Sequence, residues 1–310
     1  MRLESLRNAY GQKVVELAKD NKNIVSLEAD LGKSTMSCLM EMEHCRRFFE
    51  MNIAEQNMAS FAAGLSLTGK IPFINSFAMF VSGRAYEQIR QGIGTAHLNV
   101  KICGSSSGLS DFGDGATHQC IEDIAVMRSI PGMVVIEPVD GPQTRAMVET
   151  IVDYEGPVYF RINRADLPVL TREGETFEIG KIYEMKEGHD AVIFATGIMV
   201  SVALDAAQLL EQEGISLRVL NVSTLKPLDH DYIESFTTGM KAVLTAEEHS
   251  LIGGLNSIVC QAIAGRYTGP VKGIGIDDRF GFSTLDYDEL LACFGLTDAH
   301  IAEAVRSALK

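Results

Sequence analysis

The chain has 310 residues, of which 46% are apolar and 22% are charged, and its formal net charge is -14. This length allows about two domains with a sizeable core, so folding needs neither disulfides nor a structural metal. The longest basic run is Arg46-Arg47. The acidic balance therefore argues against nucleic acid and anionic membrane as partners, and an anionic substrate must be held by local cations.

Cysteine usage and hydropathy favour a reducing, cytoplasmic compartment. The six cysteines form no Cys-x-x-Cys pair, and several lie in apolar stretches such as Val259-Cys260, so we expect buried free thiols. Residues Met1 to Asp20 show the pattern of an amphipathic helix rather than a signal peptide. The longest apolar stretch, Ala191 to Leu204, is too short and interrupted to cross a bilayer.

Short β-rich runs alternate with helical patterns in residues 1–165, which predicts a mostly parallel sheet covered by helices on both faces. The expected strands are Ile24 to Leu27, Phe48 to Asn52, Pro72 to Ser76, Val100 to Cys103, Met133 to Ile136 and Val158 to Arg161. The expected helices are Glu55 to Leu67, Ala78 to Gln91, Ile121 to Ser129 and Gln143 to Asp153.

A charged, Gly-containing segment, residues 166–188, interrupts this alternation and predicts a linker with one edge strand. The alternation resumes in residues 189–310, so the fold class is α/β with two doubly wound domains, the second one smaller. Its expected elements are strands at 191–195, 217–222, 242–245 and 271–276 and helices at 200–213, 230–237, 255–264, 287–293 and 298–309, the last one capped by Thr297 or Asp298.

A carboxylate is placed where a strand runs into a helix, in the stretch from Phe49 to Met58. A glutamate such as Glu55 at a helix start is most often a partner of the helix dipole. The functional alternative is a carboxyl group whose proton affinity is raised by an apolar setting, which Met51, Ile53, Met58 and Ala59 would supply. Glu55 alone does not decide between the two.

Two further stretches follow in the chain. Phe77 and Phe80 are three residues apart at a helix start and would face the same side, either as core or as an apolar slot for a flat ring. The segment from Gly113 to Gln119 is a glycine-rich loop ahead of a helix, where open α/β sheets place ligands. Its Asp114 and His118 either stabilise the loop or bind substrate hydroxyls and relay protons.

These three stretches, in this order and spacing, resemble the pyrimidine-binding half of a thiamine diphosphate enzyme of the transketolase family. The resemblance implies that Glu55 hydrogen-bonds the far pyrimidine nitrogen of the cofactor, that Phe77 and Phe80 flank the ring, and that Asp30 also contacts the cofactor. The family usually has a third aromatic residue where this chain has Gly83. The ring slot is then more open, or another side chain such as Tyr86 fills it.

The family binds magnesium diphosphate through a Gly-Asp-Gly motif followed roughly 25 to 30 residues later by Asn, both Asp and Asn being oxygen ligands. The next Asn after Asp114 is Asn163, which is too distant. The resemblance therefore implies that a partner subunit supplies the diphosphate module and its Mg²⁺, with thiamine diphosphate shared at the interface. The histidines show no metal-ligand spacing, and no metal site is predicted in this chain.

Matching the family's phosphate site places Arg7, Ser34 and Arg164 at its substrate-binding positions. The planar fork of arginine suits a phosphate or a similar oxyanion. Eight residues before Asp114 the family carries a substrate-contacting His, whereas this chain has Ser106. A hydroxyl carries no charge near neutral pH, so we expect substrates other than the common pentose and hexose phosphates.

The resemblance continues into the second domain, where Glu247, His249 and the Gly253-Gly254 pair match a stretch of the family's C-terminal domain. The leading hypothesis is the C-terminal subunit of a split transketolase, active as an α2β2 heterotetramer on sugar phosphates. The alternatives are the beta subunit of a 2-oxo-acid dehydrogenase decarboxylase component, a deoxyxylulose phosphate synthase, which normally has all its domains in one chain, and a non-catalytic scaffold.

Overall fold

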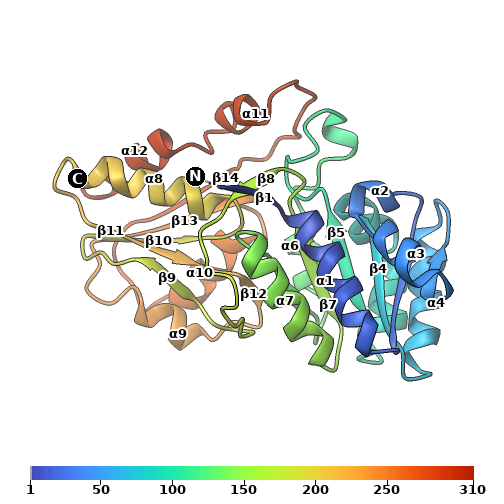
Figure 1. Cartoon of the computed structure of the whole chain (residues 1–310). Coiled ribbons are helices and arrows are strands. Elements are labelled where there is room, and N and C mark those ends of the chain that lie inside the picture. Colours follow the sequence, from blue (N-terminus) through green and yellow to red (C-terminus); the bar gives the residue numbers. More distant parts are fainter. Residues whose placement is uncertain (1) are drawn as a thin grey trace.

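The computed structural model describes residues 2–310. It contains two α/β domains that lie side by side, each built around one sheet (Figure 1). The first sheet has seven strands in the order β12-β6-β7-β5-β4-β2-β3. All of its pairs are parallel except that of β12 with β6. The strands are β2 (Ile24–Glu28), β3 (Phe48–Glu50), β4 (Ile71–Phe77), β5 (Lys101–Ser105), β6 (Val134–Ile136), β7 (Val158–Ile162) and β12 (Thr224–Lys226).

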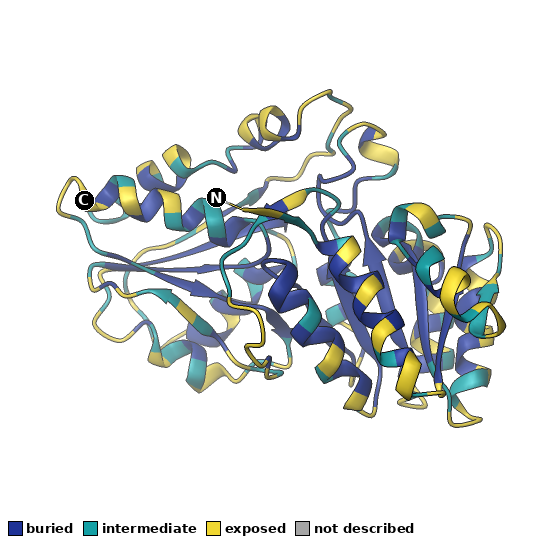
Figure 2. Cartoon of the chain, in the orientation of Figure 1, coloured by how far each residue is buried: buried dark blue, intermediate teal, exposed yellow. Residues whose placement is uncertain are grey.

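Helices cover this sheet on both faces because neighbouring strand residues point to opposite sides. Phe73 packs with helices α1 (Leu6–Asp20) and α7 (Gly141–Asp153), whereas the adjacent Ile74 packs with α4 (Glu55–Ser66) and α6 (Asp123–Arg128). The central strands of both sheets are buried, whereas edge strands such as β3 are partly exposed, and exposed residues lie on the outer faces of the helices and in loops (Figure 2). The prediction of a buried, mostly parallel sheet is confirmed.

The second sheet has the strand order β14-β13-β10-β11-β9, and only its edge strand β9 is antiparallel. Helices α8 and α12 cover one face, and α9 and α10 cover the other. The bounds are β9 (Tyr183–Lys186), β10 (Ala191–Ala195), α8 (Met199–Glu211), β11 (Leu217–Asn221), α9 (His230–Ser235), β13 (Ala242–Ser250), α10 (Leu255–Ile263), β14 (Val271–Ile276), α11 (Tyr287–Cys293) and α12 (Asp298–Ala308). The hydroxyl of Thr297 caps α12, as one of the two predicted caps.

The two domains share more structure than the predicted domain boundaries imply. The linker contains two strands instead of one: β8 (Asp166–Pro168) pairs with β1 (Leu3–Ser5), and β9 joins the second sheet. Strand β12, which lies in the second half of the chain, completes the first sheet by pairing with β6. One apolar core also runs from α4 and α6 to α9 and α10.

The structure differs locally from the sequence prediction at three places. The first helix begins at Leu6, because residues 3–5 are recruited into β1, and Ser5 caps it. The predicted helix from Ala78 to Gln91 is replaced by π-helical turns at Phe80–Arg84 and Ile89–Gly94 around a short α5 (Tyr86–Gln88); these turns contain three glycines, which are weak helix formers. The unpredicted helices α2 (Gly32–Thr35) and α3 (Cys38–His44) follow β2.

All six cysteines are free thiols, but only Cys103 and Cys120 are buried. Cys38 and Cys260 are half-buried, whereas Cys45 and Cys293 are exposed. The prediction that the cysteines are buried was therefore wrong for most of them, because an apolar neighbour in the sequence does not fix which side of an element faces the core.

A fully buried arginine joins the two domains. Arg161 of β7 pairs through Nε with Asp123 at 3.0 Å and through Nη1 with Glu137, and its Nη2 donates to the main-chain oxygen of Glu248 in β13 at 2.8 Å. Glu137 also accepts a hydrogen bond from Thr196 of the second domain at 2.8 Å. Both carboxylates and the guanidinium thus have partners in a site without water access.

We expect R161M to lower the free energy of unfolding by about 3–5 kcal/mol, because two buried carboxylates lose their cation. Urea-induced unfolding of wild type and variant measures this change. R266M is the matched control, since the ion pairs of Arg266 with Asp231 and Glu234 lie at the surface. Equal effects of the two substitutions would contradict the role given to Arg161.

Candidate active site

The predicted site residues gather at the carboxyl edge of the first sheet. Asp30 and Ser34 follow β2, Glu55 follows β3, Phe77 ends β4, Ser106 follows β5 and Arg164 follows β7. The carboxyl ends of parallel strands meet at one edge, which is where open α/β sheets bind ligands. The topology therefore brings residues from 7 to 164 into one region.

Glu55 is buried, with 1% of its surface exposed, at the first position of α4. Met58 and Ala59 are buried beside it, but Ile53 is 71% exposed, so the expected apolar setting is only partly present. Instead, Nη1 of Arg84 donates to both carboxylate oxygens, at 2.9 and 2.8 Å. Glu55 is therefore more than a helix-dipole partner, since it holds an ion pair with a side chain 29 residues away.

Aromatic rings lie next to this ion pair. Phe77 and Phe80 are stacked, with centroids 6.1 Å apart and planes at 16°, and the guanidinium of Arg84 lies 5.0 Å from the Phe80 ring centre. His118 contacts both rings edge-on, at 6.2 and 5.4 Å. Tyr86, which could have filled the space left by Gly83, points its hydroxyl toward Ser129 instead.

The proposed anion-binding residues include one that lies near Phe77. The guanidinium of Arg164 lies 5.7 Å from the Phe77 ring centre and pairs with Asp111 at 3.1 Å. Nη1 of Arg7 donates to the main-chain oxygen of Ser34 at 2.8 Å, while its Nε is buried without a partner. Burial and the nearby Arg164 lower the pKa of Arg7. The two arginines therefore share one electrostatic site.

The loop after β5 contributes hydroxyls and a histidine. Ser106 is fully buried with a φ of +54°, and its hydroxyl has no hydrogen-bond partner; the hydroxyls of Ser105 and Ser107 are likewise unpartnered. Asp114 is exposed, and the Nδ1 of His118 lies 2.9 Å from the Thr117 hydroxyl. The three serines of this loop are thus buried and neutral, while its Asp114 is exposed.

Asp30 lies at the same edge of the sheet, in the loop after β2. Its side chain is exposed, its φ is +61°, and its N–H donates to Glu50 at 3.0 Å. Its loop is held by Glu28, a buried carboxyl that accepts hydrogen bonds from Thr35 and from main-chain N–H groups, and burial raises the pKa of Glu28 to about 7.

Residues of the second domain hold the loop that follows β5 in place. Glu248 of β13 accepts hydrogen bonds from the Leu109 N–H at 2.7 Å, from the Tyr287 hydroxyl at 2.8 Å and from the Asn163 amide at 2.9 Å. Gly108 has a φ of +63°, and a Cβ there would lie 2.5 Å from the Glu248 carboxyl carbon. Glu248 therefore holds both the loop and the residue before Arg164.

Residues 281–287 hold the same loop further along. The Gln119 amide donates to the main-chain oxygen of Phe282, the Ser283 hydroxyl donates to that of Gly113, and the Thr284 N–H donates to that of Phe112. A structural role of the second domain in shaping the site follows from these contacts.

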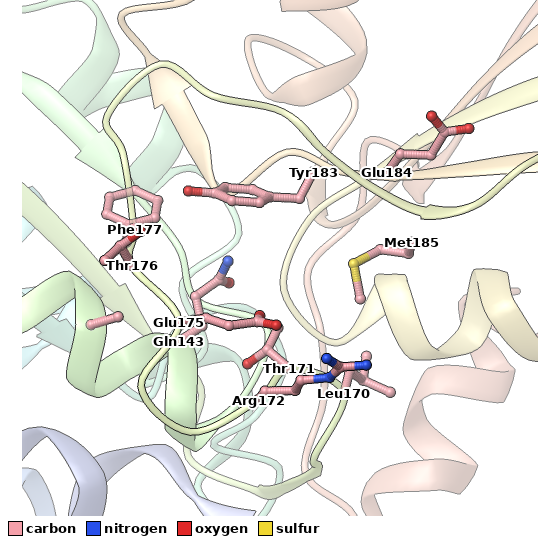
Figure 3. A pocket seen from close by; sticks show the side chains of 11 residues that line it. Gln143, Leu170, Thr171, Arg172, Glu175, Thr176, Phe177, Tyr183, Glu184 and Met185 are labelled. Atoms are coloured by element: carbon pink, nitrogen blue, oxygen red, sulfur yellow. The ribbon is translucent and has the colours of Figure 1, made fainter.

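A pocket elsewhere in the fold contains none of the predicted site residues. Figure 3 shows it between α7, the linker and β9, with the stacked rings of Phe177 and Tyr183 on one side and Arg172 and Glu175 on the other. In the part of the chain that the structure describes, no group of three or more His, Cys, Asp or Glu residues could hold a metal ion, and no helix is long and apolar enough to span a membrane.

Family models match almost the whole chain. The model of the transketolase pyrimidine-binding domain covers residues 4–169, and that of the transketolase C-terminal domain covers residues 180–301. The chain belongs to the transketolase family. Members of this family depend on thiamine diphosphate. Glu55, Phe77 and Phe80 lie within the residues that match the pyrimidine-binding domain.

Individual relatives indicate which part of a transketolase this is. A solved structure, a split-gene transketolase in an inactive beta4 tetramer, superposes with a TM-score of 0.91 at 44% identity and covers 99% of this chain and 98% of that one. A 6-deoxy-6-sulfo-D-fructose transketolase subunit of Clostridium sp. is 40% identical, covering 96% of this chain and 92% of the relative. Human transketolase is 34% identical over 97% of this chain but only 48% of its own length.

Two charged residues of this transketolase site were not predicted. Arg84 follows Gly83, where the sequence drew attention to a missing aromatic ring, but nothing in its spacing to Glu55 signals a contact. Asp111 lies three residues before Asp114, yet its pairing with Arg164 depends on the approach of two loops. Both contacts arise from tertiary structure and have no local sequence signature.

Proposed function

We propose that the chain is the C-terminal subunit of a split, thiamine diphosphate-dependent transketolase. With a separate N-terminal subunit it transfers a two-carbon ketol unit between ketose and aldose phosphates or related sugar derivatives. The observation that carries this proposal is a buried carboxyl, Glu55, beside the stacked rings of Phe77 and Phe80. The split-gene transketolase relative, which is matched over 98% of its length, supports the proposal of a separate subunit.

The residues fit the pyrimidine portion of the cofactor. Glu55 would hold the far pyrimidine nitrogen, and Phe77 and Phe80 offer an apolar surface to the ring. When bound, thiamine diphosphate supplies a carbanion that attacks the substrate carbonyl. His118, whose ring lies against both phenylalanines, and Asp114 would bind substrate hydroxyls and move protons at the carbonyl oxygen.

The diphosphate and Mg²⁺ would be held by the partner. Gly113-Asp114-Gly115 lacks a nearby Asn, and the residues that the structure describes contain no acidic or histidine cluster suited to a metal. The cofactor would then lie between the subunits of an α2β2 heterotetramer. The relative described as a split-gene transketolase is inactive as a beta4 tetramer, which agrees with a requirement for both chain types.

Two rival functions make different predictions about products. A 2-oxo-acid decarboxylase subunit or a deoxyxylulose phosphate synthase releases carbon dioxide, whereas ketol transfer does not. The arginines Arg7 and Arg164 favour a substrate with a terminal anion, which a keto-acid enzyme does not need. A non-catalytic scaffold would not need a buried Glu55 next to an aromatic pair.

Calorimetry with thiamine diphosphate and Mg²⁺ tests the two-subunit site. We expect no binding by this chain alone and binding in a mixture with the N-terminal subunit, because the metal ligands come from the partner. Ketol transfer without carbon dioxide release should accompany it. Tight binding by the isolated chain would overturn the split-site proposal.

The ion pair of Arg84 with Glu55 opposes cofactor binding. A guanidinium that donates to both oxygens favours the ionised carboxylate, whereas Glu55 must share a proton with the pyrimidine nitrogen. Arg84 is 47% exposed and can therefore swing toward solvent. We propose that it occupies the carboxylate until the pyrimidine ring replaces it.

R84Q should therefore tighten thiamine diphosphate binding to the assembled enzyme by about two- to fivefold, the size of one partly exposed ion pair. Calorimetry of wild type and variant with the same partner preparation measures the change. R90Q, a change at the exposed Arg90 in the following π-helical turn, is the matched control and should leave the affinity unaltered. Weaker binding by R84Q would instead make Arg84 part of the cofactor site.

E55Q should abolish ketol transfer while leaving subunit assembly intact, because an amide cannot share a proton with the pyrimidine nitrogen as a carboxyl does. The measurements are steady-state turnover and the mass of the complex. Q56E, one residue further on the exposed side of α4, serves as a control for charge changes at this helix start. Wild-type turnover by E55Q would contradict the catalytic assignment.

A further inference from the structure

A buried carboxylate stands inside the anion-binding site. The Asp111 side chain is 3% exposed, and its Oδ2 lies 3.1 Å from Nη1 of Arg164. The main-chain oxygen of Asp111 accepts the Gly115 N–H at 3.2 Å, which ties the residue to the turn that presents Asp114. Asp111 is therefore a fixed part of the site rather than a mobile surface acid.

Electrostatic coupling extends from this pair to the second arginine. Arg164 lowers the pKa of Arg7, whereas Asp111 and Asp166 raise it. Burial and the neighbouring Asp114 raise the pKa of Asp111, while Arg164 lowers it. The two arginines are thus opposed by two carboxylates, Asp111 and Asp166. Such a site has little positive charge left to balance a doubly charged ligand.

Two further residues lie near the arginine pair in the sequence pattern of the site, and neither adds a buried positive charge. The position that carries a histidine in the family is Ser106, whose buried hydroxyl is neutral and unpartnered. Lys33, next to Ser34, is exposed. The donors left to this site are consequently the unpaired Nε of Arg7 and the remaining N–H groups of Arg164, while the Ser106 hydroxyl lies beside Asp111.

We propose that Asp111 sets the charge selectivity of the Arg7 and Arg164 site, so that it prefers a substrate end with a single negative charge over a doubly charged phosphate. This inference rests on the proposed transketolase function for the identity of the substrate. A sulfonate on a sugar carbon is such an end, and its three oxygens suit the same donors as a phosphate. Asp111 acts through Arg164 and is a specificity-determining residue rather than a catalytic one.

Two small anions that differ mainly in charge test the proposal on the full chain. At pH 8 methyl phosphate is doubly charged, since the second pKa of a phosphate ester is about 6, whereas methanesulfonate is singly charged. Titrations followed by the methyl proton signal of each anion give both dissociation constants. We expect wild type to bind methanesulfonate at least as tightly as methyl phosphate, and D111N to shift the ratio toward methyl phosphate by about tenfold.

Three variants make the result specific. D111E keeps the charge and should keep the wild-type ratio. D153N changes the net charge equally at the exposed end of α7 and should also keep it. R164Q should weaken binding of both anions, which locates the site.

The proposal is overturned if D111N leaves the ratio unchanged, if D153N shifts it as much as D111N, or if neither anion binds to wild type. Because the titration needs neither partner nor cofactor, it is independent of ketol transfer. Absence of transfer in the assembled enzyme would remove the proposed function, while an altered ratio in D111N would still establish the charge selectivity of the site.

Discussion

The position of the active-site loops depends on one buried guanidinium. Arg161 bridges Asp123 and Glu137 of the first domain to the main chain of β13 in the second, and β13 presents Glu248 to the loop after β5. Burying a cation is unfavourable unless its partners surround it, so this arrangement exists only when both domains are packed together. The second domain, although it contains none of the predicted catalytic residues, therefore helps to define the geometry of the site.

Two buried carboxyl groups near Arg161, those of Glu247 and Glu248, likewise depend on the packing of the two domains. Burial raises the pKa of Glu247 to about 8 and that of Glu248 to about 7, and it lowers the pKa of His249 to about 4. Glu247 accepts the N–H groups of Leu255 and Asn256 at the start of α10. The Glu-x-His stretch, which the sequence matched to the family's C-terminal domain, is thus a buried polar cluster. Its carboxyl groups accept hydrogen bonds from N–H groups of a helix and a loop.

The sequence predicted those features that are local in the chain. Glu55, Phe77 and His118 could be proposed as site residues because each lies in a short stretch with a distinctive order of residues, and the strands could be predicted because their apolar runs are continuous. Strand β12 could not, since Thr224 to Lys226 is three residues long and becomes a strand only through β6. Arg84 and Asp111 were missed for a similar reason: their roles are set by a partner that the sequence places 29 and 53 residues away.

The crossing of β12 into the first sheet has a consequence for how a transketolase can be divided into genes. A break between the two domains of this chain would leave β6 as an unpaired edge, and exposed edges invite association with other chains. It would also separate Arg161 from the β13 oxygen that it binds. The two domains are therefore best inherited as one reading frame, whatever happens to the part of the enzyme that binds the diphosphate.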